Sequence, residues 1–242
     1  MALGMAAWLS AGRLRGRRRL RMDFPQRRRE LVRSLAPGST FIDVGGMWNS
    51  HGEIAFLAEE SGAERVVLFD AMEPTEEFSR ELERRDSSVQ FVSGDLHDQA
   101  ALTELGSFDV VWCTGVIYHS PSPFEQLENL RRICRRDLLL GSHVIPEVPG
   151  IEGACIWYPG MSAAGRRAFR QAHGGNRAPV CLGVTEEFDP SAGYSNYWWG
   201  ISRSALRGMV RAAGFEVVEE HFWTTFLADL LARPVESPGS RR

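Results

Sequence analysis

The sequence contains no lysine, because all 28 of its basic residues are arginine. A GC-rich coding sequence accounts for this bias without any functional role. Cysteine is scarce as well: the 242-residue chain has four, which lie far apart and form no C-x-x-C pair. This spacing argues against a disulfide framework and a zinc site, and it favours a reducing compartment, which we expect to be the cytoplasm.

Long apolar runs are also missing, since no segment approaches the roughly 20 apolar residues that a membrane-spanning helix needs. The apolar stretch at residues 1–9 precedes the arginines, whereas a secretory signal peptide carries its basic residues first. We therefore expect neither a signal peptide nor contact with a membrane.

The net charge of −3 is unevenly distributed along the chain. Residues 1–36 hold ten arginines against Asp23 and Glu30, a charge of +8 that leaves −11 for the remainder. A basic arm can contact nucleic-acid phosphates, but a disordered tail ahead of the domain is the simpler interpretation. The acidic body argues against an extensive nucleic-acid surface. We expect residues 1–25 to form a disordered basic arm and residues 235–242 to form a tail.

Short apolar runs alternate with segments of helical periodicity over the first two thirds of the chain. The runs expected to be strands are 41–44, 65–69, 89–93, 108–113 and 137–142. Helices are expected at 26–35, at 53–61 and from Pro123 to Cys134, where Ser122-Pro123-Phe124-Glu125 reads as a capping box. Apolar strands that alternate with amphipathic helices predict a parallel sheet covered on both faces.

The later part of the chain breaks this alternation. Residues 146–200 are rich in glycine, proline and aromatic residues and too long for a connector, so we expect an insertion over the active site. A helix at 202–213 precedes two strands, 216–222 and 225–231, whose short link requires antiparallel pairing. We therefore predict an α/β, Rossmann-like domain at 26–234, with a seven-stranded, mostly parallel sheet that ends in an antiparallel β-hairpin.

The first expected strand carries Asp43 and runs into a turn that begins with Gly45 and Gly46. Gly45 has no Cβ, so a ligand can approach the backbone closely. The second strand is followed by Asp70, where folds of this kind hold a ribose. Asp43 would serve a pyrophosphate poorly, and the turn does not contain the G-x-G-x-x-G of dinucleotide-binding proteins. A cationic ligand with a ribose fits better, and S-adenosylmethionine is the common one.

From about residue 26 to residue 234 the chain resembles the class I S-adenosylmethionine-dependent methyltransferases. Within that class, residues 108–123 (FDVVWCTGVIYHSPSP) are similar to the bacterial enzymes that alkylate tRNA wobble 5-hydroxyuridine, which have Gly-Val-Leu-Tyr-His before a Ser-Pro helix start. Residues 43–51 (DVGGMWNSH) also align without a gap with the Asp-Val-Gly-Cys-Gly-x-Gly-Tyr-His of that family. Met47 and Asn49 replace two of its glycines. Asparagine tolerates a left-handed backbone, whereas Met47 is harder to reconcile with the pattern.

The resemblance implies a cofactor site along the carboxyl ends of the first four strands and no metal. The residues expected to contact the cofactor are Asp43, Gly45, Gly46, Asn49, Asp70, Ala71, Asp95, Leu96 and Cys113. The turn residues would approach the methionine part, Asp70 would accept hydrogen bonds from the ribose, and Asp95 would accept one from the adenine amine. For Asp95, an ordinary Gly-Asp turn is the alternative interpretation.

Tyr118 and His119 follow the fourth strand, at the edge where an acceptor would meet the methyl group. An imidazole titrates near neutral pH, as a general base requires, which makes His119 a candidate base. The two residues could equally only shape the pocket, since many methyl transfers need only alignment. His51 is expected to order the turn, and His143 marks a second place for a base. The aromatic residues of the insertion form either a flat acceptor surface or a small core: Trp157, Tyr158, Tyr194, Tyr197, Trp198 and Trp199.

Together these features predict methyl transfer from S-adenosylmethionine to a small-molecule acceptor such as a secondary metabolite. A tRNA wobble-uridine modifying methyltransferase is one alternative, favoured by Tyr118, His119 and the basic arm and opposed by the acidic body. Carboxymethyl transfer is less expected, because the relevant family relies partly on lysine. A non-catalytic binding module with this fold is the other alternative, and Met47 and Asn49 favour it.

Overall fold

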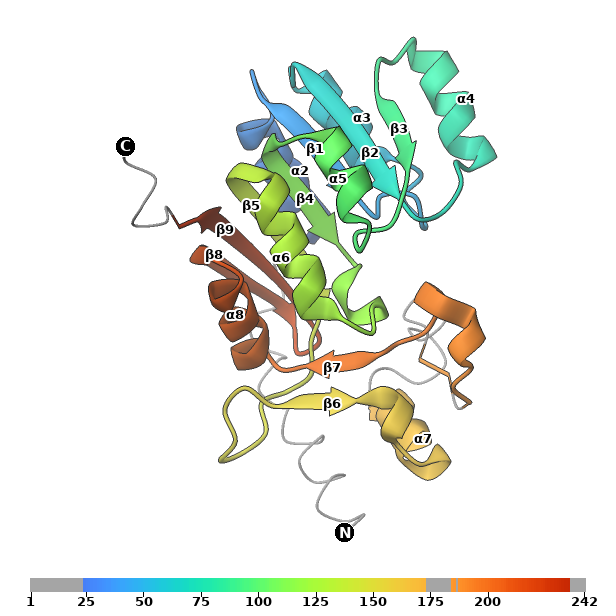
Figure 1. The fold of residues 1–242 in the computed structure, drawn as a ribbon, viewed down its shortest axis with the longest axis vertical. Coiled ribbons are helices and arrows are strands. Elements are labelled where there is room, and N and C mark those ends of the chain that lie inside the picture. Colours follow the sequence, from blue (N-terminus) through green and yellow to red (C-terminus); the bar gives the residue numbers. More distant parts are fainter. Residues whose placement is uncertain (1–23, 173–183, 186, 236–242) are drawn as a thin grey trace.

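The computed structural model describes residues 24–172, 184–185 and 187–235. Within these residues, seven strands form one sheet in the order β3-β2-β1-β4-β5-β9-β8 (Figure 1). The strands are β1 (Thr40–Val44), β2 (Arg65–Asp70), β3 (Gln90–Ser93), β4 (Phe108–Thr114), β5 (Cys134–His143), β8 (Phe215–Thr224) and β9 (Leu227–Pro234). Strands β1 to β5 pair in parallel, whereas β9 pairs antiparallel with both β5 and β8. The predicted Rossmann-like sheet with its terminal hairpin is confirmed.

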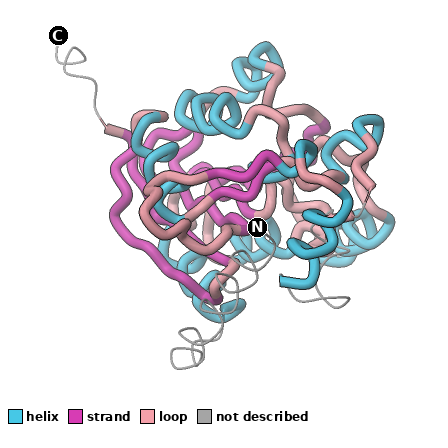
Figure 2. Tube along the Cα trace, turned by 90° about the horizontal axis from the view of Figure 1, so that it is seen from below, coloured by secondary structure: helices cyan, strands magenta, loops and turns pink. Residues whose placement is uncertain are grey.

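Helices lie on both sides of the strands (Figure 2). Side chains from α2 (Phe24–Leu35), α3 (Glu53–Glu60) and α4 (Glu76–Arg85) share one buried core with Phe41 of β1. Side chains from α5 (Gln99–Leu105), α6 (Pro123–Ile133) and α8 (Arg203–Ala212) share a second core with Ile42. Because successive residues of a strand point to opposite faces of a sheet, Phe41 packs into one core and its neighbour Ile42 into the other.

The start and the end of α6 differ from the prediction. Pro123 takes the first helical position as expected, but the Ser122 side chain makes no capping hydrogen bond. Its backbone N–H instead donates to Ser120 Oγ at 3.0 Å, so the predicted capping box does not form. The helix ends at Ile133, and Cys134 already belongs to β5, which begins three residues earlier than the predicted Asp137.

The expected insertion contains a second, two-stranded sheet of β6 (Cys155–Trp157) and β7 (Trp199–Ile201), helix α7 (Ala163–Ala172) and the 3₁₀ segment η5 (Pro190–Ser195). Figure 1 shows β6, β7 and α7 beyond one end of the main sheet. Tyr158, Phe169 and Tyr197 of the insertion form a small buried core with Tyr118 and Ile145 of the main domain. Tyr118, which follows β4, therefore joins the insertion to the end of the sheet.

The two chain ends fall largely outside the described residues. The expected basic arm lies there up to residue 23, as does the tail from residue 236. Helix α2 begins at Phe24, two residues before the predicted start. In the ranges that the structure describes, no helix combines the length and the apolar character needed to cross a membrane.

Candidate active site

The turn between β1 and α3 depends on left-handed backbone. Gly45 has φ 76°, and a Cβ there would lie only 2.3 Å from Val116 Cγ2. Asn49 (φ 57°) and His51 (φ 45°) adopt the same region, which non-glycine residues rarely do. His51 Nδ1 lies 3.0 Å from Thr75 Oγ1, a contact that suits its expected role in ordering the turn. The turn thus keeps a glycine-like backbone with fewer glycines.

Met47 does not obstruct this turn. Its side chain is fully buried in the core shared by α2, α3 and α4, and it lines neither of the two cavities described below. Its backbone N–H donates to Asp70 Oδ2 at 2.8 Å and so ties the turn to the end of β2. Met47, the residue that departs most from the glycine pattern, therefore anchors the turn through its buried side chain and this hydrogen bond.

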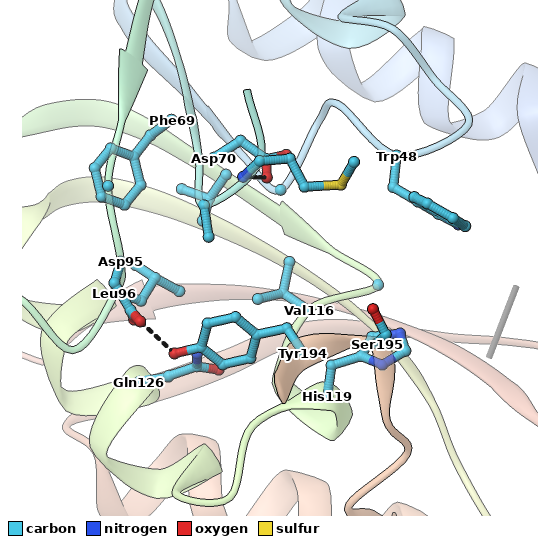
Figure 3. Close-up of a pocket in the computed structure, with 16 residues that line it drawn as sticks. Trp48, Phe69, Asp70, Asp95, Leu96, Val116, His119, Gln126, Tyr194 and Ser195 are labelled. Carbon is cyan, nitrogen blue, oxygen red and sulfur yellow. Dashed lines mark hydrogen bonds between the residues drawn. The ribbon is translucent and has the colours of Figure 1, made fainter. Parts of the chain in front are cut away.

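A cavity of about 370 Å³, which we call the Asp95 cavity, lies at the carboxyl ends of β1 and β2 and beside the loop after β3 (Figure 3). It is lined by five of the predicted cofactor residues: Gly45, Asp70, Ala71, Asp95 and Leu96. Both oxygens of the buried Asp70 accept backbone hydrogen bonds, from Met47 and from Met72, each at 2.8 Å. Each carboxylate oxygen has a second lone pair, so Asp70 retains capacity for ribose hydroxyls. Burial raises the pKa of Asp70 above its ordinary value.

Two further polar residues line the Asp95 cavity. The Tyr194 hydroxyl, from η5, donates to Asp95 Oδ2 at 2.6 Å, and burial followed by this hydrogen bond raises the pKa of Tyr194. Gln126, in the first turn of α6, is 2% exposed, and its Oε1 has no hydrogen-bond partner among the described residues. The sequence singled out Tyr194 only as one of several aromatic residues, and it carried no signal for Gln126.

A second cavity of about 520 Å³, which we call the Asp43 cavity, adjoins the first one between the β1 turn, α2 and the ends of β4 and β5. Among the predicted residues it is lined by Asp43, Gly45, Gly46, Asn49, Tyr118 and His119. Asp43 is 2% exposed, and no described group hydrogen-bonds to its Oδ2. A Cβ on Gly46 would lie 2.2 Å from this oxygen, so glycine is needed there. Burial, and second the charge of Asp70, raises the pKa of Asp43 to about 7.

His119 lines both cavities. Its Nδ1 lies 2.7 Å from the backbone carbonyl oxygen of Asn196, which only accepts, so Nδ1 carries the proton and Nε2 is left as an acceptor. Burial lowers the pKa of His119 below its ordinary value, so the ring is neutral at pH 7. The geometry thus gives His119 the protonation state that a base requires. The Tyr118 ring packs on it, with the ring centroids 4.4 Å apart.

His143 is a further imidazole of the Asp43 cavity. It is 2% exposed, and its Nδ1 lies 2.8 Å from the Tyr197 hydroxyl. Its place at the end of β5 agrees with the sequence interpretation, which named it as a second position for a base.

Cys113 does not reach the site with its side chain. It is fully buried in the core and lines neither cavity, although the resemblance implied that Cys113 contacts the cofactor. Of the insertion's aromatic residues that the structure describes, only Tyr194 lines either cavity. Tyr158 and Tyr197 lie in the insertion's core, and Trp157 packs on Trp198 and Trp199. Across the described ranges, no group of three or more potential ligand side chains is placed to hold a metal ion.

Comparisons with known proteins agree with this arrangement. Residues 48–140, which are 93 of the 242, match the family described as a methyltransferase domain. No curated protein sequence matches the chain.

Several solved structures share the fold. One is the N-terminal domain of EvdMO1 with SAH bound, at 18% identity over 90% of this chain and 83% of that chain, with a TM-score of 0.57. Another is magnesium protoporphyrin IX methyltransferase (ChlM) from Synechocystis PCC 6803 with bound SAH, at 15% identity over 88% and 89%, with a TM-score of 0.53. The [4+2]-cyclase SpnF also matches, at 16% identity over 90% and 84%, with a TM-score of 0.57. Residues 48–140 are therefore similar to a methyltransferase domain, and the chain has the Rossmann-like fold that these solved structures share.

Proposed function

We propose that this protein is an S-adenosylmethionine-dependent methyltransferase that acts on a small-molecule acceptor. The observation that carries the proposal is the buried Asp43, whose Oδ2 has no partner among the described residues. A buried acceptor without a donor is costly, so its retention points to a ligand that supplies the donor. The α-ammonium of S-adenosylmethionine is such a donor, and a cation also favours the ionised form of the carboxyl group.

The far end of the site offers a second acceptor of the same kind. Gln126 Oε1 is buried and unpartnered among the described residues, and it lines the Asp95 cavity together with Asp70 and Asp95. An adenine amine is a donor for the amide oxygen, and ribose hydroxyls are donors for Asp70. A ligand with an ammonium at one end and a purine amine at the other therefore suits both cavities. The SAH bound in two proteins of this fold supports the same assignment.

S-adenosylmethionine supplies a methyl group that is already activated on a sulfonium. The protein is then left to bind the acceptor, to align it and to exclude water. His119 faces both cavities with Nε2 as an acceptor, so it takes the proton from the attacking hydroxyl or amine. Tyr118 packs on the His119 ring and fixes its orientation.

We do not propose tRNA as the acceptor, because the part of the chain after residue 36 carries a net charge of −11, which argues against an extensive nucleic-acid surface. The [4+2]-cyclase shows that proteins of this fold are not all methyltransferases by name. A decisive experiment must therefore detect methyl transfer as well as cofactor binding.

The test begins with calorimetry of SAH binding to the wild type, to Asp43→Asn and to Glu104→Gln, an exposed change on α5 that serves as the control. Loss of a charge-assisted hydrogen bond at Asp43 should weaken binding by about 1.5–3 kcal/mol, and the control should bind like the wild type. Cofactor carrying a labelled methyl group is then incubated with the enzyme and a cell extract. Label in the small-molecule fraction supports the proposal, and label confined to RNA favours the tRNA alternative. A wild type that does not bind SAH would refute the cofactor assignment.

A further inference from the structure

The two cavities meet at four residues that line both of them: Gly45, Trp48, Gly115 and His119. Gly45 and Gly115 have φ of 76° and 83° and contribute only backbone. The side chains at the junction are therefore one indole and one imidazole. We propose that the acceptor is a planar aromatic compound with a phenolic hydroxyl and that its ring binds between Trp48 and His119. This inference rests on the proposed function and names its acceptor class.

Trp48 is presented by an anchored backbone. The residue before it, Met47, is fully buried and hydrogen-bonded to Asp70, and the residue after it, Asn49, holds a left-handed turn. Ser50 Oγ donates to the Gly46 carbonyl at 2.7 Å and closes the same turn. Yet the Trp48 side chain is 56% exposed, on the rim of both cavities. An uncovered indole on an anchored backbone is a ready surface for stacking an aromatic ring.

His119 forms the other side of this junction. Figure 3 shows it with Trp48 at one end of the site, away from Asp95 and Leu96 at the other end. Because burial lowers its pKa, His119 is a weak base. A weak base suits an acidic nucleophile such as a phenol, whose pKa near 10 lies far below that of an aliphatic alcohol.

The rest of the Asp43 cavity fits a neutral aromatic acceptor. Phe24, Tyr118 and His143 contribute further rings to its wall. Its two arginines are held in ion pairs, Arg28 with Asp229 at 2.7 Å and Arg29 with Glu53 at 2.6 Å. The cavity therefore has an aromatic wall, and its cations are already engaged by carboxylates.

The reaction balances with these groups. The phenolic oxygen forms a bond to the methyl carbon while the carbon–sulfur bond breaks, and the electron pair of that bond stays on sulfur. The phenolic proton passes to Nε2 of His119 and is later released to water.

The test compares 1-naphthol with its saturated counterpart decahydro-1-naphthol, each titrated by calorimetry into protein saturated with SAH. Four proteins are used: the wild type, Trp48→Ala, Trp48→Phe, and Trp157→Ala as the control. Trp157 is also an exposed indole (42%), but it lines neither cavity. We expect 1-naphthol to bind the wild type and the control alike, about tenfold more weakly to Trp48→Ala, and within about threefold of the wild type to Trp48→Phe. The saturated alcohol should bind at least tenfold more weakly than 1-naphthol.

The inference is overturned if 1-naphthol does not bind, if the saturated alcohol binds equally well, or if Trp48→Ala loses no affinity for 1-naphthol. It is also overturned if Trp48→Ala weakens binding of S-adenosylmethionine but not of SAH, with 1-naphthol unaffected, because Trp48 would then face the sulfonium. A wild type that fails to bind SAH is a separate result, which refutes the proposed function itself.

Discussion

Asp43 makes the stability of the ligand-free protein depend on pH in an unusual direction. Burial, followed by the charge of Asp70, raises the pKa of Asp43 from 3.8 to about 7. As the pH rises above 3.8, the unfolded chain releases this proton while the folded chain still holds it. The free energy of unfolding therefore falls by up to about 1.4 kcal/mol per pH unit, or roughly 4 kcal/mol in all by pH 7. Below pH 3.8 the penalty is absent, and above pH 7 it is constant.

The variant Asp43→Asn isolates this effect, because its amide is neutral at every pH and nearly the same size. Urea unfolding of both proteins at pH 5, 6, 7 and 8 gives a difference in unfolding free energy at each pH. Groups other than Asp43 and the coupled Asp70 titrate alike in both proteins, so the difference reports this carboxyl pair. The unfolding free energy of Asp43→Asn minus that of the wild type should grow by roughly 2–3 kcal/mol between pH 5 and pH 7 and then level off. A difference that stays constant from pH 5 to pH 8 would refute the reasoning.

The same carboxyl group should control the pH dependence of cofactor binding. An ammonium pairs with the ionised form of Asp43, so SAH binding below pH 7 must displace the proton. We expect affinity to fall by up to about tenfold per pH unit from pH 7 to pH 5, with release of about one proton per SAH at pH 6. Calorimetry in two buffers of different ionisation enthalpy measures that proton, and Asp43→Asn should release none. An affinity independent of pH would place the ammonium elsewhere.

Three other variants test the remaining assignments. Gln126→Leu removes a buried, unpaired oxygen, so it should not lower the melting temperature. It should nevertheless weaken SAH binding about 2- to 10-fold. Full retention of affinity would show that Gln126 does not belong to the adenine site. Tyr194→Phe frees Asp95 Oδ2 and should strengthen SAH binding about 2- to 10-fold, whereas weaker binding would mean that the hydroxyl closes over the bound cofactor. His119→Ala should leave SAH affinity unchanged and slow turnover roughly 10²–10⁴-fold. The inflection below pH 6.5 in the pH–rate profile should also disappear. A smaller loss of turnover with an unchanged profile would mean that His119 only shapes the pocket.

The sequence predicted the elements whose burial pattern is strong. The parallel strands read as continuous apolar runs because both of their faces are covered. Helix α4 was missed, since Phe78 is its only buried residue and charged side chains fill most of its other positions. Helix α7 was hidden in a segment that the sequence identified only as an insertion, since its buried residues pack mainly within that insertion.

The residues of the candidate site that the sequence predicted are those placed by the parallel strands, and the residues it missed come from other elements. Asp43, Asp70 and Asp95 were found because the carboxyl ends of parallel strands meet at one edge, where chain order alone brings side chains together. Gln126 and Tyr194 line the Asp95 cavity together with Asp70 and Asp95, but they come from a helix and from the insertion. Their approach depends on tertiary packing that no local pattern encodes.

Met47 shows why a missing glycine is weak evidence against this kind of site. A glycine pattern records two requirements, a left-handed backbone and room beside the ligand. Here Asn49 provides the backbone at its own position, while the Met47 side chain turns into the core and leaves the cavities open. The departure that favoured a non-catalytic binding module therefore loses its force, because neither requirement is violated. The same turn places the exposed Trp48 on the rim of the cavities, between the buried Met47 and Asn49 with its left-handed backbone.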